Sequence, residues 1–540
     1  MKQTNDRMNK HNYVDSEIVF ALVGAVGTDL DSIIKILRER LENFFRYTTD
    51  LIYISHDILR KFSKEIEINT EYKRINHYMD LGTKLRKETN NGILAMAAAD
   101  LIQQKRKEKY GEGSPGYLPR YAFIIKSLKN TEEVKVLRTI YGNGFYLIGV
   151  YESAEERKKN LCEKRNISKE QAKYLLEKDE DENVGHGQQA RDTFQMSDFF
   201  IDSSDEKKVQ ANIYRILDLI FGSPFITPTF GEFAMFMAHC ASLRSADLSR
   251  QIGAVVCKND EILAMGVNDC PSFGGGLYWP KYNKTNHSYE DLPDGRDYMR
   301  GYDTNKKEFV NIVEEIFDKF NIEKNMENFI KIRETSLGNL TEFGRVVHAE
   351  MEALVTCARN NISSRDTELY VTTFPCHNCA KHIIAAGVKK VVYIEAYPKS
   401  KTFEFYKESI TTSDNSSSDN DSQKVLFLPF FGVGPRRFYE LFAMSTNFLP
   451  DKKRKEKAGD MSSYGKIVQW SQDSANLRSQ MLPTSYLDRE VEYSLQYNAS
   501  KDKFLKNTNK PQKKKRRINN EKFSNDGKNK VFRKTDRGMA

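Results

Sequence analysis

Long hydrophobic runs and cysteines are both scarce in this sequence. No window holds 18 consecutive apolar residues, and residues 1–15 are mainly polar. A membrane-spanning helix needs about 20 apolar residues, and a secretory signal needs an apolar segment near the start, so we expect neither. Seven cysteines in 540 residues are too few for a disulfide framework. A reducing, cytoplasmic location is therefore the expected one.

Outside its last 40 residues the chain also lacks a positive charge excess. The net charge is +9, but residues 501–540 hold 15 basic and four acidic side chains, which leaves 69 basic and 71 acidic side chains elsewhere. The positive charge gathers around KKKRR at 513–517. This composition predicts a disordered basic tail. Two interpretations stay open: a tail that binds a polyanion such as RNA, and a solvated end that keeps the protein soluble.

The length and the spacing of apolar runs predict an α/β protein with two domains. The run EIVFALV at 17–23 ends at Gly24 and precedes a helical pattern, which is how an α/β nucleotide-binding unit begins. Buried parallel strands are further predicted at 51–55, 121–128, 145–151 and 197–202. The predicted parts are an N-terminal tail (1–16), a parallel-sheet domain (17–222), a second domain (229–445), and a polar linker with the basic tail (450–540).

The first domain lacks the lysine of a working phosphate loop. That loop reads Gly-x4-Gly-Lys-Ser/Thr, and its lysine contacts the β- and γ-phosphates. Here the turn after the first predicted strand reads Gly24-Ala-Val-Gly27-Thr28-Asp29. An active nucleotide kinase is therefore disfavoured. We expect Gly24, Gly27 and Thr28 to belong to a domain that binds a nucleotide or a partner and gates the second domain; a purely structural role is the alternative.

The second domain carries three residues with the spacing of a metal site. His348 begins one predicted helix, and Cys376 and Cys379 begin another, with a predicted strand between the two helices. Zinc prefers these ligand types, and three protein ligands leave the fourth position open for water. Both helix N-termini would favour thiolates. Because two thiolates cancel the charge of zinc, a neighbouring base is needed, and Glu350 stands two residues after the histidine.

The pattern His-x-Glu followed by Pro-Cys-x-x-Cys is a signature of zinc deaminases that act on nucleobases. The alternative is a structural zinc site, in which His377 or His382 would be the fourth ligand. A structural site requires neither Glu350 nor a helix–strand–helix–strand order, so we favour the catalytic interpretation. Whether Cys270 joins a second metal site stays open.

Residues 229–445 resemble the deoxycytidylate deaminase family of the cytidine deaminase fold, which is an α/β/α architecture. The resemblance rests on VVHAEMEAL, on LYVTTFPCHNCAKHIIAAGVKKVVY and on LSRQIGAVVCKNDEILAMGVND. It implies that Zn²⁺ binds to His348, Cys376 and Cys379 and activates a water that attacks C4 of cytosine. It also implies that Glu350 takes the proton of this water, delivers it to N3 and protonates the leaving amine.

The same resemblance places Asn268 where the family contacts the sugar 3′-hydroxyl, although this chain has Asn268-Asp269 in place of Asn-Gly. A triphosphate substrate would need cations. The predicted phosphate contacts are Lys399, after the last strand of the second domain, and Arg436 and Arg437 in GVGPRRF, with Arg250 as a further candidate. The alternative for each is an ordinary surface cation.

Residues 17–222 resemble a P-loop nucleotide-kinase-like domain through VGAVGTD, IYISHDILR, EERKKNL and SDFFIDSS. The order of the two domains resembles the bacterial antiphage dCTP deaminases. This resemblance implies hydrolytic deamination of dCTP, and also of dCMP, to deoxyuridine nucleotides in infected cells. It further implies a homo-oligomer and an inhibitory small RNA, which we expect at the basic tail.

Two other functions stay open. One is a cytosine or adenine deaminase of tRNA or single-stranded DNA, whose strand the tail would follow. The other is an RNA-regulated sensor in which the enzymatic activity is secondary.

Overall fold

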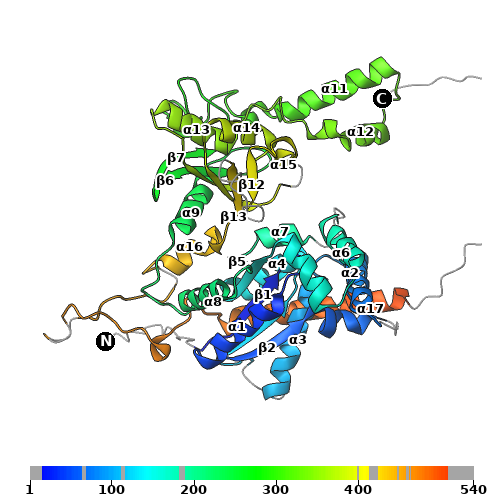
Figure 1. The fold of residues 1–540 in the computed structure, drawn as a ribbon, viewed down its shortest axis with the longest axis vertical. Coiled ribbons are helices and arrows are strands. Elements are labelled where there is room, and N and C mark those ends of the chain that lie inside the picture. The colour runs from blue at the N-terminus through cyan, green and yellow to red at the C-terminus, as the bar shows by residue number, and fades with distance from the viewer. Residues whose placement is uncertain are drawn as a thin grey trace, which may run out of the picture.

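The computed structural model describes residues 15–63, 69–110, 116–181, 189–397, 400–412, 424–446, 449–457, 461 and 464–508. The described chain forms two α/β bodies, here called the first and the second domain, and α9 and α16 lie between them (Figure 1). The basic run at 513–517 and Lys399 lie outside the described residues. None of the described helices combines the length and the apolar composition needed to cross a membrane.

A six-stranded sheet with the order β14-β5-β4-β1-β3-β2 forms the centre of the first domain. All neighbouring strands are parallel except β14, which pairs antiparallel with β5. Its elements are β1 (Ile18–Val23), α1 (Leu30–Asn43), β2 (Thr48–Tyr53), α2 (Glu71–Glu88), α3 (Ile93–Tyr110), β3 (Tyr121–Lys126), α4 (Thr131–Tyr141), β4 (Phe145–Tyr151), α5 (Ala154–Lys159), α6 (Lys169–Asp181), α7 (Ala190–Gln195), β5 (Phe199–Asp202) and α8 (Glu206–Ile220). The predicted parallel strands are confirmed.

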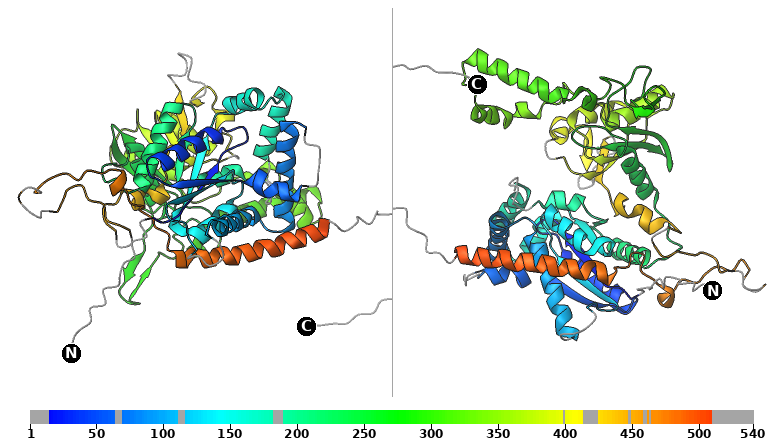
Figure 2. Two further views of the ribbon diagram at one scale, coloured as in Figure 1. Left: turned by 90° about the horizontal axis from the view of Figure 1, so that it is seen from below. Right: turned by 180° about the vertical axis from the view of Figure 1, so that it is seen from behind.

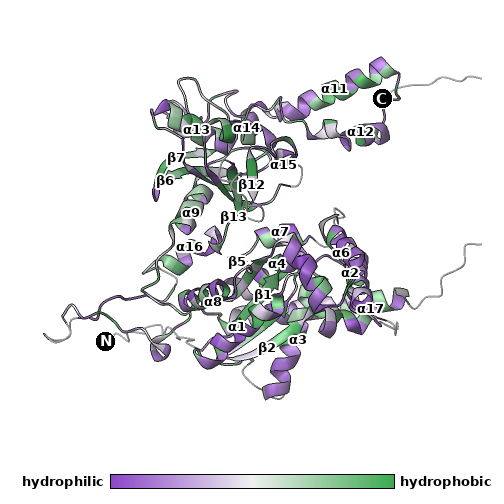
Figure 3. Ribbon diagram, in the orientation of Figure 1, coloured by the Kyte–Doolittle hydropathy of each residue, from purple (hydrophilic) through white to green (hydrophobic). Residues whose placement is uncertain are grey.

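Both faces of this sheet are buried, which explains why β1 reads as a continuous apolar run. Alternate residues of β1 belong to different cores: Val19 and Ala21 pack with α3 and α4, whereas Phe20 and Leu22 pack with α1 and α8. Figure 3 shows hydrophobic strands inside and mainly hydrophilic residues on outer helices such as α6. The strand order reverses direction at β1, and in open α/β sheets ligands bind outside the carboxyl ends of strands at such a point.

The structure differs from the expected linker and disordered tail at residues 483–508. These residues form α17 (Pro483–Thr508), which packs against α3 and α4 and runs along the outside of the first domain (Figure 2). Tyr486, Tyr497 and Phe504 of α17 are buried. The prediction for 450–540 was therefore wrong over this stretch. Tyr486, Tyr493, Tyr497 and Phe504 recur with helical spacing, but the buried Glu490 interrupts this stripe and weakens the signal.

A buried ionic group fixes α17 to the first domain. Nε and Nη2 of Arg106 donate to the carboxylate of Glu17 at 3.0 Å each, and Nη1 donates to Glu490 of α17 at 2.5 Å. The hydroxyl of Tyr486 donates to Glu17 at 2.5 Å. Buried charges are tolerated when they are paired and hydrogen bonded, as they are here. Residues from three distant parts of the chain therefore meet at one guanidinium.

The second domain is built on another six-stranded sheet, with the order β12-β13-β11-β10-β6-β7. β6 is antiparallel to its neighbours β7 and β10, and the other pairs are parallel. Its elements are α9 (Phe230–Ser242), β6 (Gly253–Lys258), β7 (Glu261–Val267), β8 (Lys281–Asn283), β9 (Ser288–Glu290), α10 (Asp297–Arg300), α11 (Thr304–Phe320), α12 (Met326–Arg333), α13 (Ala349–Arg359), β10 (Glu368–Thr373), α14 (His377–Ala385), β11 (Lys390–Glu395), α15 (Thr402–Phe405), β12 (Ile410–Thr412) and β13 (Val425–Pro429). α9 covers one face, and α13 and α14 cover the other. The predicted α/β/α layering is confirmed.

The segment after β13 links the domains. β14 (Gly432–Val433) extends the sheet of the first domain, and α16 (Pro435–Phe442) follows it. Glu232, in the first turn of α9, accepts hydrogen bonds from the backbone N–H of Val433 at 2.8 Å and from both terminal nitrogens of Arg215 at 2.7 Å. A Cβ at Gly432 would lie 2.8 Å from the Glu232 carboxylate, so glycine is required there. The two domains are thus joined by side chains as well as by the chain itself.

Candidate metal centre and active site

Two helix N-termini bring the predicted metal ligands together. His348 is the N-cap of α13, Cys376 is the N-cap of α14, and Cys379 lies in the first turn of α14. Nδ1 of His348 lies 3.2 Å from Sγ of Cys379 and 3.4 Å from Sγ of Cys376. Zn–N bonds of about 2.0–2.1 Å and Zn–S bonds of about 2.3 Å put tetrahedral N and S donors about 3.6 Å apart. The donor set therefore fits a zinc ion with a small outward adjustment.

The number of ligands favours the catalytic form of zinc site. Within the described part of the chain, this is the one group of three metal-binding side chains whose ligand atoms lie within 4.8 Å of one another. Neither His377 nor His382 belongs to the group, and the His377 ring instead packs against Phe405. Three protein ligands leave the fourth tetrahedral position for water.

Cys270 has a different environment. Its buried thiol lies 3.7 Å from Oδ1 of Asp297, and burial raises the pKa of this thiol to about 11. No further group of close metal-binding side chains includes Cys270 among the described residues. Cys270 is therefore a buried packing residue of the second domain.

The two zinc-binding cysteines differ in their protonation before a metal binds. A hydrogen bond from Cys379 lowers the pKa of Cys376 to about 4, assisted by the bond to His348. The bond to Cys376, together with burial, raises the pKa of Cys379 well above its ordinary value. The hydrogen bond to Cys376 also raises the pKa of His348 to about 9. In the metal-free site these shifts favour the thiolate on Cys376 and the protonated forms of Cys379 and His348.

Zinc binding at neutral pH is expected to release the protons of His348 and Cys379, because zinc binds neutral imidazole and thiolates. The zinc affinity should then increase as the pH rises towards the pKa of His348, about 9, because both groups lose their protons more easily at higher pH. Titration calorimetry of zinc into metal-free protein, in buffers of different ionisation enthalpy, measures the protons released. Equal heats in all buffers would contradict this assignment of protons.

Glu350 lies beside the ligand group, in the first turn of α13. Its side chain is only 4% exposed. Burial raises the pKa of this carboxyl, and the charge of a protonated His348 acts in the opposite direction. A hydrogen bond joins Glu350 to Cys379. Among the described residues, no lysine or arginine forms an ion pair with Glu350, so its carboxyl is not part of a structural salt bridge.

Asn268 holds the loop next to the ligand group. Its Oδ1 accepts from the N–H of Ile252 at 2.7 Å, and its Nδ2 donates to the carbonyl of Arg250 at 2.7 Å. The next residue, Asp269, pairs through its backbone with Val347, which precedes the histidine ligand. These bonds place Asn268 close to the metal centre and fix the backbone of Arg250. The predicted sugar contact of Asn268 stays a prediction.

The two arginines of α16 do not reach the ligand group. Arg437 is 1% exposed; its guanidinium lies 3.3 Å from Asp198 and 2.6 Å from Glu440, and stacks over the ring of Tyr146. Nε of the half-exposed Arg436 lies 3.4 Å from Asp198. Figure 1 shows α16 next to the first domain and away from α13 and α14. Arg437 therefore has a structural role in place of the predicted phosphate contact.

The remaining predicted contacts are Arg436, Lys399 and the turn at Gly24, Gly27 and Thr28. The phosphate contact of Arg436 stays a prediction, and that of Lys399 falls outside the described residues. Gly24, Gly27 and Thr28 form the turn between β1 and α1, and their binding role also stays a prediction.

Two residues near the ligand group carry no sequence motif. The negative charge of Asp247 raises the pKa of His348. Burial raises the pKa of Tyr397, the thiolate of Cys376 raises it further, and Arg250 lowers it. Asp247 lies before β6 and Tyr397 lies between β11 and β12, so only the folded chain brings them to the ligands.

Comparison with known proteins agrees with this site. Residues 229–395 match the family model described as the cytidine and deoxycytidylate deaminase zinc-binding region. The deoxycytidylate deaminase of Enterobacteria phage T2 is 32% identical over 173 residues, which cover 31% of this chain and 79% of that protein. The human deoxycytidylate deaminase is 39% identical over 54 residues, or 10% of this chain and 29% of that protein.

A crystal structure of dCMP deaminase from cyanophage S-TIM5, in complex with dCMP and dUMP, is similar at 24% identity. The match covers 38% of this chain and 98% of that chain, with a TM-score of 0.21, which is too low to carry weight for the fold. The family model and the His/Cys/Cys group together identify zinc as the cofactor. Through its second domain, the chain belongs to the deoxycytidylate deaminase family.

Proposed function

We propose that the chain deaminates deoxycytidine nucleotides, both dCTP and dCMP, to deoxyuridine nucleotides and ammonia. The observation that carries this proposal is the buried carboxyl of Glu350 beside a three-ligand metal group. A bound zinc ion supplies a Lewis acid that acidifies water. The similarity to the phage T2 deoxycytidylate deaminase supports deoxycytidine nucleotides as the substrate class.

In this proposal, Glu350 carries the protons of the reaction. Its carboxylate takes one proton from the water that attacks C4 and delivers it to N3. It then takes the proton of the newly added hydroxyl group and passes it to the amine. The C–N bond breaks, ammonia leaves, and the C4 oxygen becomes the carbonyl of uracil. Because the side chain is buried, bulk water does not compete for the proton between these transfers.

Arg250 is the cation that we assign to the substrate phosphate. Asn268 and Asp247 fix its backbone, at 2.7 and 2.9 Å respectively. Its side chain is exposed, and among the described residues it forms no ion pair. It also acts electrostatically on Tyr397, which is next to Cys376. A free guanidinium near the metal group offers the planar donor pair that phosphates prefer.

Replacing Arg250 by alanine is expected to lower kcat/KM for dCMP by roughly 10- to 100-fold, because a charge-assisted hydrogen bond contributes about 1.5–3 kcal/mol. Deoxycytidine, which has no phosphate, should be deaminated at an unchanged rate. The matched control is Arg365→Ala. Arg365 is also exposed, but it lies just before the start of β10, whereas Cys376 and Cys379 follow the end of this strand. Equal losses for dCMP and deoxycytidine would rule out the phosphate contact.

The direct test of the function is deamination by the purified full-length protein. dCTP, dCMP and a cytosine-containing single-stranded DNA would be offered separately, and the release of ammonia and uracil would be measured. Turnover of the free nucleotides supports the proposal. Turnover of the DNA alone would instead establish a polynucleotide deaminase.

We further propose that this activity depletes deoxycytidine nucleotides in phage-infected cells. The order of the two domains supports this role. The proposal further includes a homo-oligomer and a first domain that gates the deaminase. The test is the dCTP pool of infected cells that express the wild-type chain or an inactive variant. An equal fall in dCTP in both cultures would contradict the role.

A further inference from the structure

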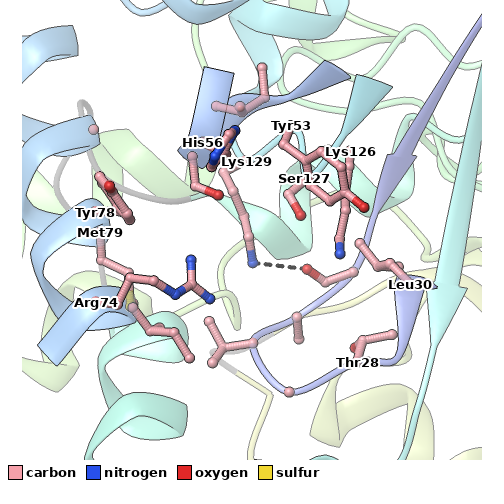
Figure 4. A pocket seen from close by; sticks show the side chains of 18 of the residues that line it. Thr28, Leu30, Tyr53, His56, Arg74, Tyr78, Met79, Lys126, Ser127 and Lys129 are labelled. Atoms are coloured by element: carbon pink, nitrogen blue, oxygen red, sulfur yellow. Dashed lines mark hydrogen bonds between the residues drawn. The ribbon is translucent and has the colours of Figure 1, made fainter. Parts of the chain in front are cut away.

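The first domain contains a cavity of ≈ 560 Å³ beside the turn after β1. Figure 4 shows Arg74 and Lys129 reaching into it, and Nζ of Lys129 donates to the carbonyl of Gly24 at 2.9 Å, the bond drawn as a dashed line. All the residues that line this cavity belong to the first domain, between Gly24 and Arg165. The cavity is therefore separate from the metal centre of the second domain.

In the second domain, a long insertion interrupts the chain immediately before the metal centre. It consists of residues 271–345, which leave the domain after β7 and return just before α13. Its two ends lie side by side, because Asp269 and Val347 exchange both backbone hydrogen bonds, at 3.3 and 3.0 Å. The first end follows Asn268, the predicted sugar contact, and the second end precedes the metal ligand His348. The two ends therefore join the substrate side of the site to its metal side.

Arg296, inside the insertion, holds the first end. Its Nη2 lies 3.3 Å from Oδ2 of Asp269, and its Nη1 donates to Oδ2 of Asp291 at 3.2 Å. Nη2 also donates to the carbonyl of Tyr278, which accepts a second hydrogen bond from Nη2 of Arg244 at 2.7 Å. Arg296 is only 6% exposed and Asp269 only 2%. One buried guanidinium thus ties the loop of Asp269 to two other parts of the insertion.

Asp297, the next residue, holds the second end. Its Oδ1 accepts from Nη1 of Arg345 at 2.8 Å, and Nη2 of Arg345 donates to the carbonyl of Gly295 at 2.9 Å. Because Arg296 and Asp297 are neighbours in the chain, the end that each one holds cannot move without the other. Residues 295–297 are here called the clamp. The clamp fixes the distance between Asp269 and Arg345.

The pair of Arg296 and Asp269 is an inefficient way to stabilise a domain. Nε of Arg296 and Oδ2 of Asp269 are buried, and neither has a hydrogen-bond partner among the described residues. Burying two charges costs desolvation free energy, and replacing such a pair by apolar side chains often leaves the stability unchanged or higher. A charge pair does, however, define one relative position of the two segments that carry it. We therefore assign this pair a role in positioning.

The clamp controls a distance on which the reaction depends. His348 belongs to the metal group, whereas Asn268 and Arg250 are assigned to the substrate. Nδ2 of Asn268 donates to the carbonyl of Arg250 at 2.7 Å, so both substrate contacts move together with the first end of the insertion. A misplacement of about 1 Å can cost about 100-fold in rate. A loosened clamp leaves the metal and the nucleotide bound, but misplaces one relative to the other.

We propose that Arg296 is a positioning residue for the deamination reaction. Through Asp269, and together with Asp297, it holds the substrate contacts at the productive distance from the metal ligand His348. This inference rests on the proposed function. Arg296 is buried and acts through Asp269, so it makes no contact with the substrate itself.

The test compares Arg296→Gln, Arg296→Lys, Asp269→Asn and the double variant Arg296→Gln/Asp269→Asn in the full-length protein. The matched control is Arg300→Gln, because Arg300 lies at the end of α10 and its Nε donates to the carbonyl of Asp294 at 3.0 Å. Thermal unfolding and zinc content are measured first, followed by kcat and KM for dCMP. Hydrogen–deuterium exchange of the backbone at 345–350 reports the bond between the two ends without requiring activity.

Arg296→Gln is expected to lower kcat for dCMP roughly 10- to 100-fold while KM and zinc content stay unchanged. The backbone at 345–350 should exchange faster. Arg296→Lys keeps the charge and should lose less. The double variant should lose no more than the larger of its two single variants, because both remove the same link. Arg300→Gln should match the wild type in every measurement.

The proposal is overturned if Arg296→Gln leaves the exchange at 345–350 unchanged, or if it lowers zinc content and added zinc restores kcat. Additive losses in the double variant would show that Arg296 does not act through Asp269. If Arg296→Gln does not fold, Arg296→Lys and Asp269→Asn decide by the same measurements. A wild-type chain that does not turn over dCMP would contradict the proposed function, whereas the exchange would still test the clamp.

Discussion

Glu350→Gln is expected to abolish deamination while zinc stays bound. The substitution keeps the size of the buried side chain but removes its ability to accept and return a proton. General acid–base catalysis contributes roughly 10²- to 10⁴-fold to a rate. A loss at the upper end of this range is expected, because one carboxyl serves both the attack of water and the departure of the amine. The measurements are kcat for dCMP and the zinc content per chain.

The matched control for Glu350 is Glu352→Gln. Glu352 lies on the same helix and is also buried, but its carboxylate forms an ion pair with Arg359 at 3.0 Å. We expect this variant to keep its turnover. A Glu350→Gln protein that retains more than a tenth of the wild-type turnover would exclude Glu350 as the proton carrier. Loss of zinc from this variant would assign the residue a role in the metal site instead.

A chain that ends at residue 482 is expected not to fold in its first domain. Removing α17 exposes the surface that buries Tyr486, Tyr497 and Phe504. Burial of each such side chain stabilises the fold by roughly 1.5–3 kcal/mol, which sums to a large part of the roughly 5–15 kcal/mol stability of a domain. Arg106 also loses Glu490, one of its two buried carboxylate partners. Soluble yield and thermal unfolding measure the effect.

A chain that ends at residue 508 is the control for this truncation. It keeps α17 and removes only the basic tail, so its unfolding temperature should equal that of the full chain. If the tail binds the inhibitory small RNA that we expect, this shorter chain should lose the salt-sensitive part of RNA binding. Equal stability of the chains ending at 482 and 508 would show that α17 does not hold the first domain together.

The metal group could be predicted from the sequence because its information is local. His348 and Glu350 lie on one helical turn, as do Cys376 and Cys379, and each turn directly begins a helix. The parallel strands were predictable for a similar reason, since a strand buried on both faces is a continuous apolar run. Neither feature depends on knowing which distant segments meet.

The features that sequence analysis missed all depend on distant partners. Arg437 follows two glycines and looks available for phosphate, yet Asp198, far earlier in the chain, neutralises it inside the protein. α17 is stabilised by Arg106 and Glu17 of the first domain, and its stripe of Tyr486, Tyr493, Tyr497 and Phe504 is interrupted by Glu490, which is buried only because it pairs with Arg106.

The position of α17 has a consequence for the order of events during translation. The ribosome makes the second domain after most of the first domain but before α17. The second domain therefore has its full sequence while the first domain still lacks its last helix. Domains usually fold as units during synthesis. The zinc-binding half is thus expected to reach its native state before the N-terminal half, although it is synthesised later.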